Sequence, residues 1–271
     1  MRATVRDVTI GYDVHGERGD WVLLVMGLGY ARWGWAWQVE DLARDFRVIA
    51  FDNRGVGESD APPGPYTVAQ MAEDAAGLLV AIGVDRAHVM GASLGGCIAQ
   101  ELALSHAERV DRLVLACTTF GGSRSLPMPE VSVRLMAEAP SLPEDVRLRR
   151  FVENAMSDAF VKEHPEVVDR ILEHRRETAQ SPEAWQAQAA AGAAFDASER
   201  VGNIRAETLV ITGTDDRVVD PGNSTLLAEA IPAAELVQLP GGHVFTIEQP
   251  ERFNSLVRAF LQEGTVATVA V

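Results

Sequence analysis

Residues 88–97 read His-Val-Met-Gly-Ala-Ser-Leu-Gly-Gly-Cys and contain the pattern Gly-x-Ser-x-Gly, centred on Ser93. An apolar strand-like run precedes the pattern and a helical segment follows it, which is the setting in which this pattern forms a sharp, strained turn. Gly91 and Gly95 leave the room that such a turn needs. The turn would expose the Ser93 hydroxyl at a helix N-terminus, where free amides favour negative charge. We therefore predict a nucleophile at Ser93; the alternative is a packing turn of small residues.

Short apolar, β-branched runs recur on both sides of this turn, at 21–25, 48–51, 88–90, 113–116, 208–212 and 236–239. These runs are typical of buried strands. Helical patterns separate them; one has an apolar face from Val68 to Ile82 and a capping box formed by Thr67 and Gln70. Alternating strands and helices predict an α/β fold with a mostly parallel sheet.

Two segments of the chain do not follow this alternation. Residues 5–14 alternate apolar and polar side chains, which predicts an antiparallel hairpin at the sheet edge. From about Pro127 to Phe195 the sequence becomes helical and charged, and repeated prolines divide it into several short helices. With 271 residues the chain has room for one elaborated domain. We expect a core of residues 1–126 and 196–271 with a helical lid at 127–195.

A serine nucleophile needs an imidazole to take its proton and a carboxylate to orient that imidazole. Of the six histidines, His243 alone lies in a glycine-rich loop after a predicted strand and late in the chain, so it is the predicted base. Three aspartates follow the strand at 208–212, namely Asp215, Asp216 and Asp220. Asp220 precedes a proline and fits a helix cap. We prefer Asp216 as the orienting acid.

Acyl transfer also needs two amides that bind the developing oxyanion. The Leu94 amide is one candidate, and the Leu28 amide, in the glycine-rich loop Met-Gly-Leu-Gly at 26–29, is the other. Trp33, Trp35 and Trp37 follow this loop at period-two spacing. They either line an apolar substrate pocket, as we expect of Trp33 and Trp37, or pack the helix beneath it.

Composition excludes several other classes of protein. A formal net charge of −15 disfavours binding to nucleic acids and anionic membranes. Lys162 is the one lysine and lies outside any glycine-rich loop, so Schiff-base and P-loop chemistry are not expected. The histidine and cysteine spacing predicts no metal site, and we expect no cofactor. Two cysteines without a secretory leader or a long apolar segment favour a cytoplasmic location.

Five motifs in chain order resemble those of the lidded α/β-hydrolases, a group that includes 3-oxoadipate enol-lactonases, carboxylesterases and cofactor-free haloperoxidases. They are Val-Met-Gly-Leu-Gly at 25–29, Phe-Asp-Asn-Arg-Gly-Val-Gly-Glu-Ser at 51–59, Gly-Ala-Ser-Leu-Gly-Gly at 91–96, Gly-Thr-Asp-Asp at 213–216 and Gly-Gly-His at 241–243. The resemblance spans nearly the whole chain and implies the triad Ser93, Asp216 and His243. The chain departs from the pattern at Met26, where many members have histidine.

The resemblance implies a serine hydrolase that cleaves a carboxylic ester or lactone through an acyl-serine intermediate. Two other functions remain open at this level: transfer of the acyl group to hydrogen peroxide by the same triad, and ligand binding by the same fold with little turnover. The expected partner is a small-molecule ester or lactone. Whether the substrate is an ester, a ring lactone or a thioester, and how many chains assemble, is not encoded in a readable pattern.

Overall fold

A computed structural model describes residues 1–266, and its centre is an eight-stranded sheet in the order β1-β2-β4-β3-β5-β6-β7-β8. The strands are β1 (Arg2–Val5), β2 (Val8–His15), β3 (Trp21–Val25), β4 (Arg47–Phe51), β5 (Ala87–Ala92), β6 (Val110–Ala116), β7 (Glu207–Gly213) and β8 (Ala234–Leu239). The six strands from β3 to β8 run parallel. The prediction of a mostly parallel α/β sheet is confirmed.

The first two strands form the antiparallel hairpin that the alternating pattern predicts. Arg2 pairs with Gly11 and Val5 with Val8, and β2 then joins the sheet antiparallel to β4. The side chains of β2 range from buried to exposed along its length, as at a half-covered edge. The hairpin therefore closes one edge of the sheet.

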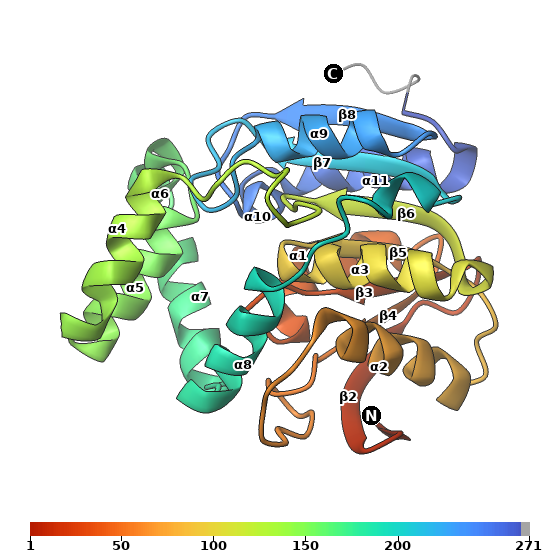
Figure 1. Cartoon of the computed structure of the whole chain (residues 1–271), viewed down its shortest axis with the longest axis horizontal. Coiled ribbons are helices and arrows are strands. Elements are labelled where there is room, and N and C mark those ends of the chain that lie inside the picture. Colours follow the sequence, from red (N-terminus) through yellow and green to blue (C-terminus); the bar gives the residue numbers. More distant parts are fainter. Residues whose placement is uncertain (267–271) are drawn as a thin grey trace.

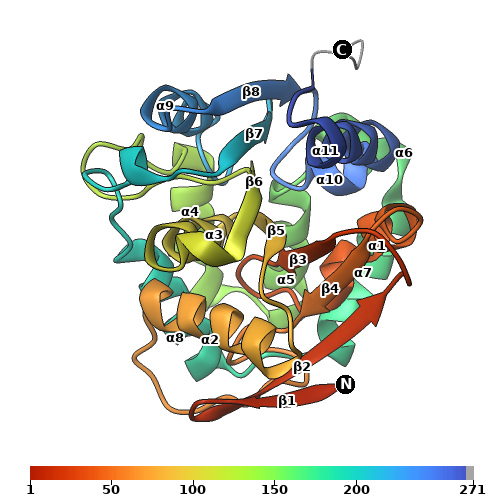
Figure 2. The same cartoon turned by 90° about the vertical axis from the view of Figure 1, so that its right-hand side faces the viewer.

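Helices cover both faces of the sheet (Figures 1 and 2). One face carries α2 (Val68–Ala81), α3 (Leu94–Ser105) and α9 (Gly222–Ala230), and the other carries α1 (Ala36–Leu42) and α11 (Pro250–Glu263). Each face has its own apolar core, with Met71 and Ile98 in one and Trp35 and Phe260 in the other. Thr67 caps α2 as predicted, since its hydroxyl accepts from the Gln70 amide at 3.0 Å. Burial of these faces is the main source of stability.

Five α-helices lie between β6 and β7 in the chain, at the end of the sheet toward which the parallel strands point (Figure 1). They are α4 (Glu130–Glu138), α5 (Glu144–Asn154), α6 (Asp158–Glu163), α7 (Pro165–Glu177) and α8 (Pro182–Ala193), and we call them the inserted helices. Prolines begin α7 and α8 and directly precede α4 and α5. The prediction of several short helices is confirmed.

Short elements complete the chain: η1 (Arg32–Trp35), η2 (Ala107–Arg109), η3 (Ala139–Ser141), η4 (Val201–Asn203) and α10 (Phe245–Glu248). Cys97 and Cys117 are free thiols, and both are buried. Over residues 1–266, none of the helices combines the length and apolar character needed to cross a membrane.

Candidate active site

The register of the parallel strands brings five loops to one edge of the sheet. Val25 at the end of β3 pairs with Gly91 near the end of β5, and the last residue of β5 pairs with the last residue of β6. Farther along, Gly213 pairs with Leu239. The loops that follow these strands hold residues 26–29, Ser93, Cys117, Asp216 and His243. This is the edge at which open parallel sheets collect their functional groups.

Ser93 occupies a strained turn between β5 and α3. Its φ of 55° and ψ of −122° are unusual for a residue with a side chain, and its hydroxyl makes no capping hydrogen bond. A Cβ atom on Gly91 would lie 2.2 Å from the Gly95 carbonyl oxygen, and one on Gly95 would lie 2.1 Å from the Val25 carbonyl oxygen. Both glycines are therefore required by close backbone contacts, and Ser93 itself is half-buried.

His243 and Asp216 form a buried pair. Nδ1 of His243 lies 2.7 Å from Oδ2 of Asp216, whose side chain is fully buried. The other oxygen, Oδ1, accepts from the amides of Val218 at 2.8 Å and Val219 at 3.0 Å. These bonds hold the carboxylate so that Nδ1 carries its proton toward it, which leaves Nε2 of the imidazole able to accept a proton.

The other two aspartates of this loop have different positions. The side chain of Asp215 is exposed, while its backbone amide donates to the Gly241 carbonyl at 2.9 Å. The carboxylate of Asp220 accepts from the Gly222 amide at 2.9 Å, an Asx turn at the start of α9. Of the three candidates, it is Asp216 that contacts His243.

Cys117 interacts with the backbone of Ser93 and is affected by the charge of Asp216. It follows β6 with a φ of 44° and is buried. Burial raises the pKa of its thiol well above the usual value, the negative charge of Asp216 raises it further, and contact with the Ser93 backbone opposes both. The thiol is therefore protonated at neutral pH and is a poor nucleophile.

The loop after β3 passes directly against Ser93. A Cβ atom on Gly27 would lie 3.0 Å from Cβ of Ser93, so a glycine permits this approach. The Leu28 amide, next in the chain, makes no hydrogen bond to a carbonyl within residues 1–266. Leu94 opens α3, so its amide belongs to the first turn, whose N–H groups lack intrahelical acceptors. Leu94 thus follows Ser93 in the chain, and the loop that carries Leu28 approaches Ser93 in space, while the role of both amides as oxyanion donors stays a prediction.

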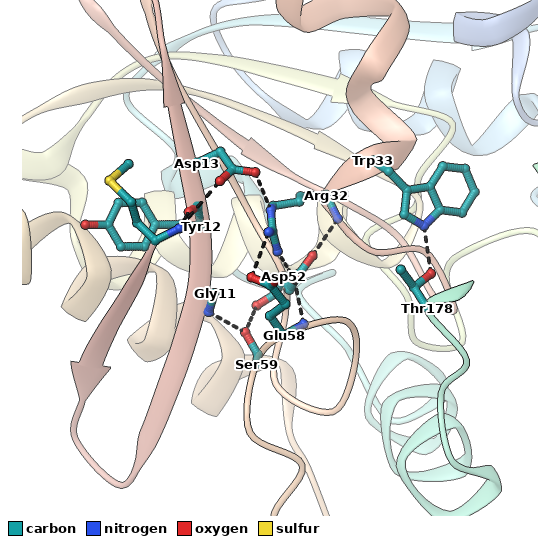
Figure 3. Close-up of polar contacts among 10 residues, drawn as sticks. Gly11, Tyr12, Asp13, Arg32, Trp33, Asp52, Glu58, Ser59 and Thr178 are labelled. Atoms are coloured by element: carbon teal, nitrogen blue, oxygen red, sulfur yellow. Dashed lines mark hydrogen bonds and ion pairs between the residues drawn. The ribbon is translucent and has the colours of Figure 1, made fainter. Parts of the chain in front are cut away.

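Charged side chains form a network next to the loop after β3 (Figure 3). Asp52, whose side chain is fully buried, accepts from the Arg32 amide at 2.6 Å and also binds the Arg32 guanidinium. The guanidinium reaches Asp13 at 2.5 Å and Glu58 at 2.8 Å as well. Burial raises the pKa of Asp52, against the effect of these hydrogen bonds. Because Arg32 directly follows the loop and Asp52 directly follows β4, this pair fastens the loop to the end of β4.

The following residues of the same motif make two further ties. The Asn53 amide group donates to the Met26 carbonyl at 2.8 Å. The Arg54 guanidinium binds the buried Asp74 through two hydrogen bonds, at 2.5 and 2.7 Å, and its carbonyl accepts from Gln188 of α8 at 2.7 Å. Residues 52–54 therefore link the loop after β3, α2 and the inserted helices.

The three tryptophans after this loop divide between the core and the inserted helices. Trp35 is fully buried in the core. Trp33 donates from Nε1 to the Thr178 hydroxyl at 2.9 Å (Figure 3). Its ring also stacks on His174, with ring centroids 4.9 Å apart. The Arg170 guanidinium of α7 lies over the Trp37 ring, with its Cζ atom 5.2 Å from the ring centroid.

Trp33 also lines a cleft of about 730 Å³, together with Asp13, Arg32 and Glu58. Ser93 and His243 are not among the residues that line this cleft. The substrate-pocket role of Trp33 and Trp37 remains a prediction, since both side chains pack against the core as well as against α7 and the residue after it.

Potential metal ligands do not cluster in the part of the chain that the structure describes. Across residues 1–266, no group of three or more histidine, cysteine or acidic side chains is arranged to hold a metal ion.

Sequence reasoning missed three residues that border the site: Cys117, Ser157 and Glu248. The Glu248 carboxylate accepts from the Gly242 amide, beside His243, at 2.8 Å, and from the Ser157 hydroxyl at 2.6 Å. Glu248 offered one weak signal, because it is an acidic residue directly after the apolar stretch 244–247. Ser157 and Cys117 had no distinctive sequence pattern.

Comparison with known proteins places these features among enzymes. Residues 20–250 match the family model described as the alpha/beta hydrolase fold. A putative carbamate hydrolase RutD of Caulobacter sp. (strain K31) is 34% identical over 259 residues, covering 92% of this chain and 94% of that protein.

Two solved structures superpose over nearly the whole chain. The enol-lactonase from Burkholderia xenovorans LB400 has a TM-score of 0.88 and 31% identity, covering 97% of this chain and all of that one. A thermophilic esterase from Thermogutta terrifontis has a TM-score of 0.84 and 28% identity, covering 97% of this chain and 98% of that one.

Proposed function

Since this chain belongs to the α/β-hydrolase family, we propose that it hydrolyses a small ester, lactone or carbamate through a covalent intermediate on Ser93. The resemblance that the five motifs implied is thereby confirmed, and the chain is a hydrolase. The bond classes come from the relatives: a putative carbamate hydrolase, an enol-lactonase and an esterase. Carbamates, lactones and esters each have a bond between a carbonyl carbon and a leaving group, and one acyl-transfer site can cleave all three kinds of bond.

The first half of the reaction forms the intermediate. Nε2 of His243 takes the Ser93 hydroxyl proton as the oxygen attacks the substrate carbonyl carbon, and Asp216 stabilises the imidazolium that results. The carbonyl oxygen becomes an oxyanion that the amides of Leu28 and Leu94 bind. When the tetrahedral intermediate collapses, the bond to the leaving group breaks and His243 returns the proton to that group.

The second half releases the acid and restores the enzyme. His243 takes a proton from water, the hydroxide attacks the acyl carbon, and the bond to the Ser93 oxygen breaks with return of the proton to that oxygen. The inserted helices, predicted as a lid over 127–195, stand at the carboxyl ends of the strands and would shape the acyl or alcohol pocket. Free, buried thiols at Cys97 and Cys117 support the cytoplasmic location within this proposal.

The observation that carries the proposal is the 2.7 Å contact between His243 Nδ1 and the buried Asp216 carboxylate. A carboxylate is costly to bury without a partner, so this pair is maintained against a desolvation penalty. Its position at the same sheet edge as the strained Ser93 turn matches the needs of acyl transfer.

Labelling with a fluorophosphonate, followed by intact-protein and peptide mass spectrometry, tests the proposal. We expect one adduct, on Ser93, and hydrolysis of a panel of p-nitrophenyl esters, lactones and aryl carbamates. Ser93→Ala should lose the adduct and lower turnover by about 10⁴-fold or more. The exposed Ser123 provides the matched control, and Ser123→Ala should behave as wild type. An adduct elsewhere, or persistent turnover by Ser93→Ala, contradicts the assignment.

The same panel distinguishes hydrolysis from acyl transfer to hydrogen peroxide. Each ester is incubated with and without peroxide, and peracid is measured alongside the free acid. If peroxide speeds the consumption of ester and peracid is the main product, the activity is acyl transfer to peroxide and not hydrolysis. Ser93 would remain the nucleophile in that case.

A further inference from the structure

The inserted helices contact the loop that carries His243 at one short turn, residues 155–157 between α5 and α6. The amide of Val244, directly after His243, donates to the Ala155 carbonyl at 3.0 Å. The amide of Gly242, directly before His243, donates to Oε1 of Glu248 at 2.8 Å. The backbone is therefore held on both sides of the imidazole.

Glu248 extends the second of these contacts to the same turn. Its Oε1 also accepts from the Ser157 amide at 3.1 Å, and its Oε2 accepts from the Ser157 hydroxyl at 2.6 Å. The Ser157 hydroxyl in turn caps α6 by accepting from the Phe160 amide at 3.3 Å. Hydrogen bonds to a carboxylate are stronger than those between neutral groups, so Glu248 is a firm link between the turn and the histidine loop.

Close packing leaves this link little freedom. A Cβ atom on Gly242 would lie 2.7 Å from the Ala155 carbonyl oxygen and from a backbone atom of Met156. Met156 is fully buried, and Ala155 nearly so. The turn and the histidine loop therefore touch backbone to backbone, and a movement of one displaces the other.

The loop that carries Asp216 also contacts the turn at 155–157. Arg217, the neighbour of Asp216, donates from its guanidinium to the Met156 carbonyl and pairs with Asp158 at 2.9 Å. The buried Ser132 hydroxyl, from α4, donates to the Arg217 carbonyl. Both members of the Asp216–His243 pair thus have a neighbouring residue fixed to the inserted helices.

We propose that the turn at 155–157 positions the Asp216–His243 pair, and that Glu248 is the positioning residue through which the turn acts on His243. The inserted helices then serve the chemistry as well as substrate choice. This inference rests on the proposed function, because it concerns the base of that reaction. A misplacement of about 1 Å in a reacting group can cost about 10²-fold in rate.

The decisive variants are Glu248→Ala and Glu248→Gln, with Glu251→Ala as the matched control on an exposed glutamate three residues away. Glu248→Ala removes all three acceptor contacts and should lower kcat by about 10- to 100-fold with little change in KM. Glu248→Gln keeps an oxygen that accepts from the two amides and should recover most of that loss. Glu251→Ala should stay within about twofold of wild type.

Ser157→Ala tests the link from its other end. Ser181 caps α8 just as Ser157 caps α6, but it has no contact with Glu248 among those that the structure describes in residues 1–266, so Ser181→Ala reproduces the loss of a helix cap alone. We expect Ser157→Ala to lower kcat about three- to tenfold and Ser181→Ala to leave it unchanged. Because the two residues act together, Ser157→Ala should add little to the loss in Glu248→Ala.

A readout that needs no substrate separates positioning from mere stability. The proton on Nδ1 of His243, bonded to the buried Asp216, should give a distinct downfield proton NMR signal in wild type, Glu251→Ala and Ser181→Ala. In Glu248→Ala we expect this signal to shift upfield or broaden while circular dichroism still reports a folded chain. If Glu248→Ala does not fold, Glu248→Gln and Ser157→Ala carry the same comparison.

The outcomes for the two proposals differ. Unchanged kcat and an unchanged downfield signal in Glu248→Ala and Ser157→Ala would overturn the positioning role while wild type still labels at Ser93 and turns over. Absence of labelling and turnover in wild type would instead overturn the proposed function, and the NMR comparison would still show whether Glu248 sets the geometry of the Asp216–His243 pair.

Discussion

Ser93 lies between two groups of loops that are built in different ways. On one side, which we call the base side, Asp216 and His243 are buried side chains joined directly at 2.7 Å. On the other, the oxyanion side, the loop from Met26 to Leu28 offers backbone amides, and the charged pair of Arg32 and Asp52 stands behind it. The function proposed for the base side therefore depends on the chemical identity of two side chains. The function proposed for the oxyanion side depends on the path of the backbone.

The inserted helices hold the two sides by different contacts. On the base side, the turn at 155–157 meets the histidine loop through backbone carbonyls and the Glu248 carboxylate. On the oxyanion side, the Arg175 guanidinium of α7 lies 4.9 Å from the centroid of the Tyr30 ring, and Thr178, directly after α7, accepts a hydrogen bond from Trp33. Burial raises the pKa of Tyr30, so the phenol stays neutral in this contact. Such partly exposed contacts are weaker and more tolerant of change.

The largest effect should come from the charge on the base side. Asp216→Asn keeps the size of the side chain but removes the negative charge and favours the wrong imidazole tautomer, so we expect kcat to fall by about 10⁴-fold. The exposed neighbour gives the matched control, and Asp215→Asn should remain within about twofold of wild type. Steady-state kinetics on the best ester of the panel measures both. The reverse ranking would assign the acid to Asp215.

A smaller effect should follow from moving the backbone on the oxyanion side. Gly27→Ala places a methyl group 3.0 Å from Cβ of Ser93 and 3.1 Å from the Ala92 carbonyl oxygen, so the loop must shift. We expect kcat to fall by about 10²-fold through poorer alignment of the Leu28 amide. Gly202→Ala is the control, because its nearest neighbour would be 3.4 Å away. Full activity in Gly27→Ala would remove this loop from the oxyanion site.

The smallest effect should come from the outer contact between the oxyanion side and α7. Thr178→Val keeps the shape of the side chain but loses the acceptor for Trp33 Nε1 and the bond to the His174 carbonyl. We expect a loss of about 1 kcal/mol in unfolding free energy and a Tm lower by about 2–4 °C. Thermal unfolding and kinetics measure the change, with the exposed Thr4→Val as control. A drop in kcat comparable to that of Gly27→Ala would show that both sides depend equally on the inserted helices.

The strands show how far local sequence patterns reach. The strand predicted at 21–25 is β3 residue for residue, because an unbroken apolar run in a central parallel strand is buried on both faces. The strand predicted at 113–116 begins earlier, at Val110. Asp111 and Arg112 interrupt the apolar run, yet they extend β6 because their side chains are only half-buried there. Backbone pairing with neighbouring strands, which the apolar pattern does not contain, sets that boundary.

The site shows the same division. The Ser93 turn was readable because the glycines, the strand before it and the helix after it are all within ten residues. The choice among Asp215, Asp216 and Asp220 was open from the residues themselves, and the motif match favoured Asp216. The fold brings Asp216 to His243 because the loop after β7 turns its Oδ1 onto the amides of Val218 and Val219, which directs Oδ2 toward the imidazole.

By itself, the sequence determined the α/β alternation, the edge hairpin, the cap of α2, the short inserted helices and the candidate nucleophile and base. Each of these follows from periodicity, turn chemistry or capping over a few residues. The tertiary structure alone decided that Glu248 meets Ser157, 91 residues away in the chain, and that Trp33 meets Thr178, 145 residues away. Contacts of this kind depend on how packed elements meet in space, and no local pattern in the chain records them.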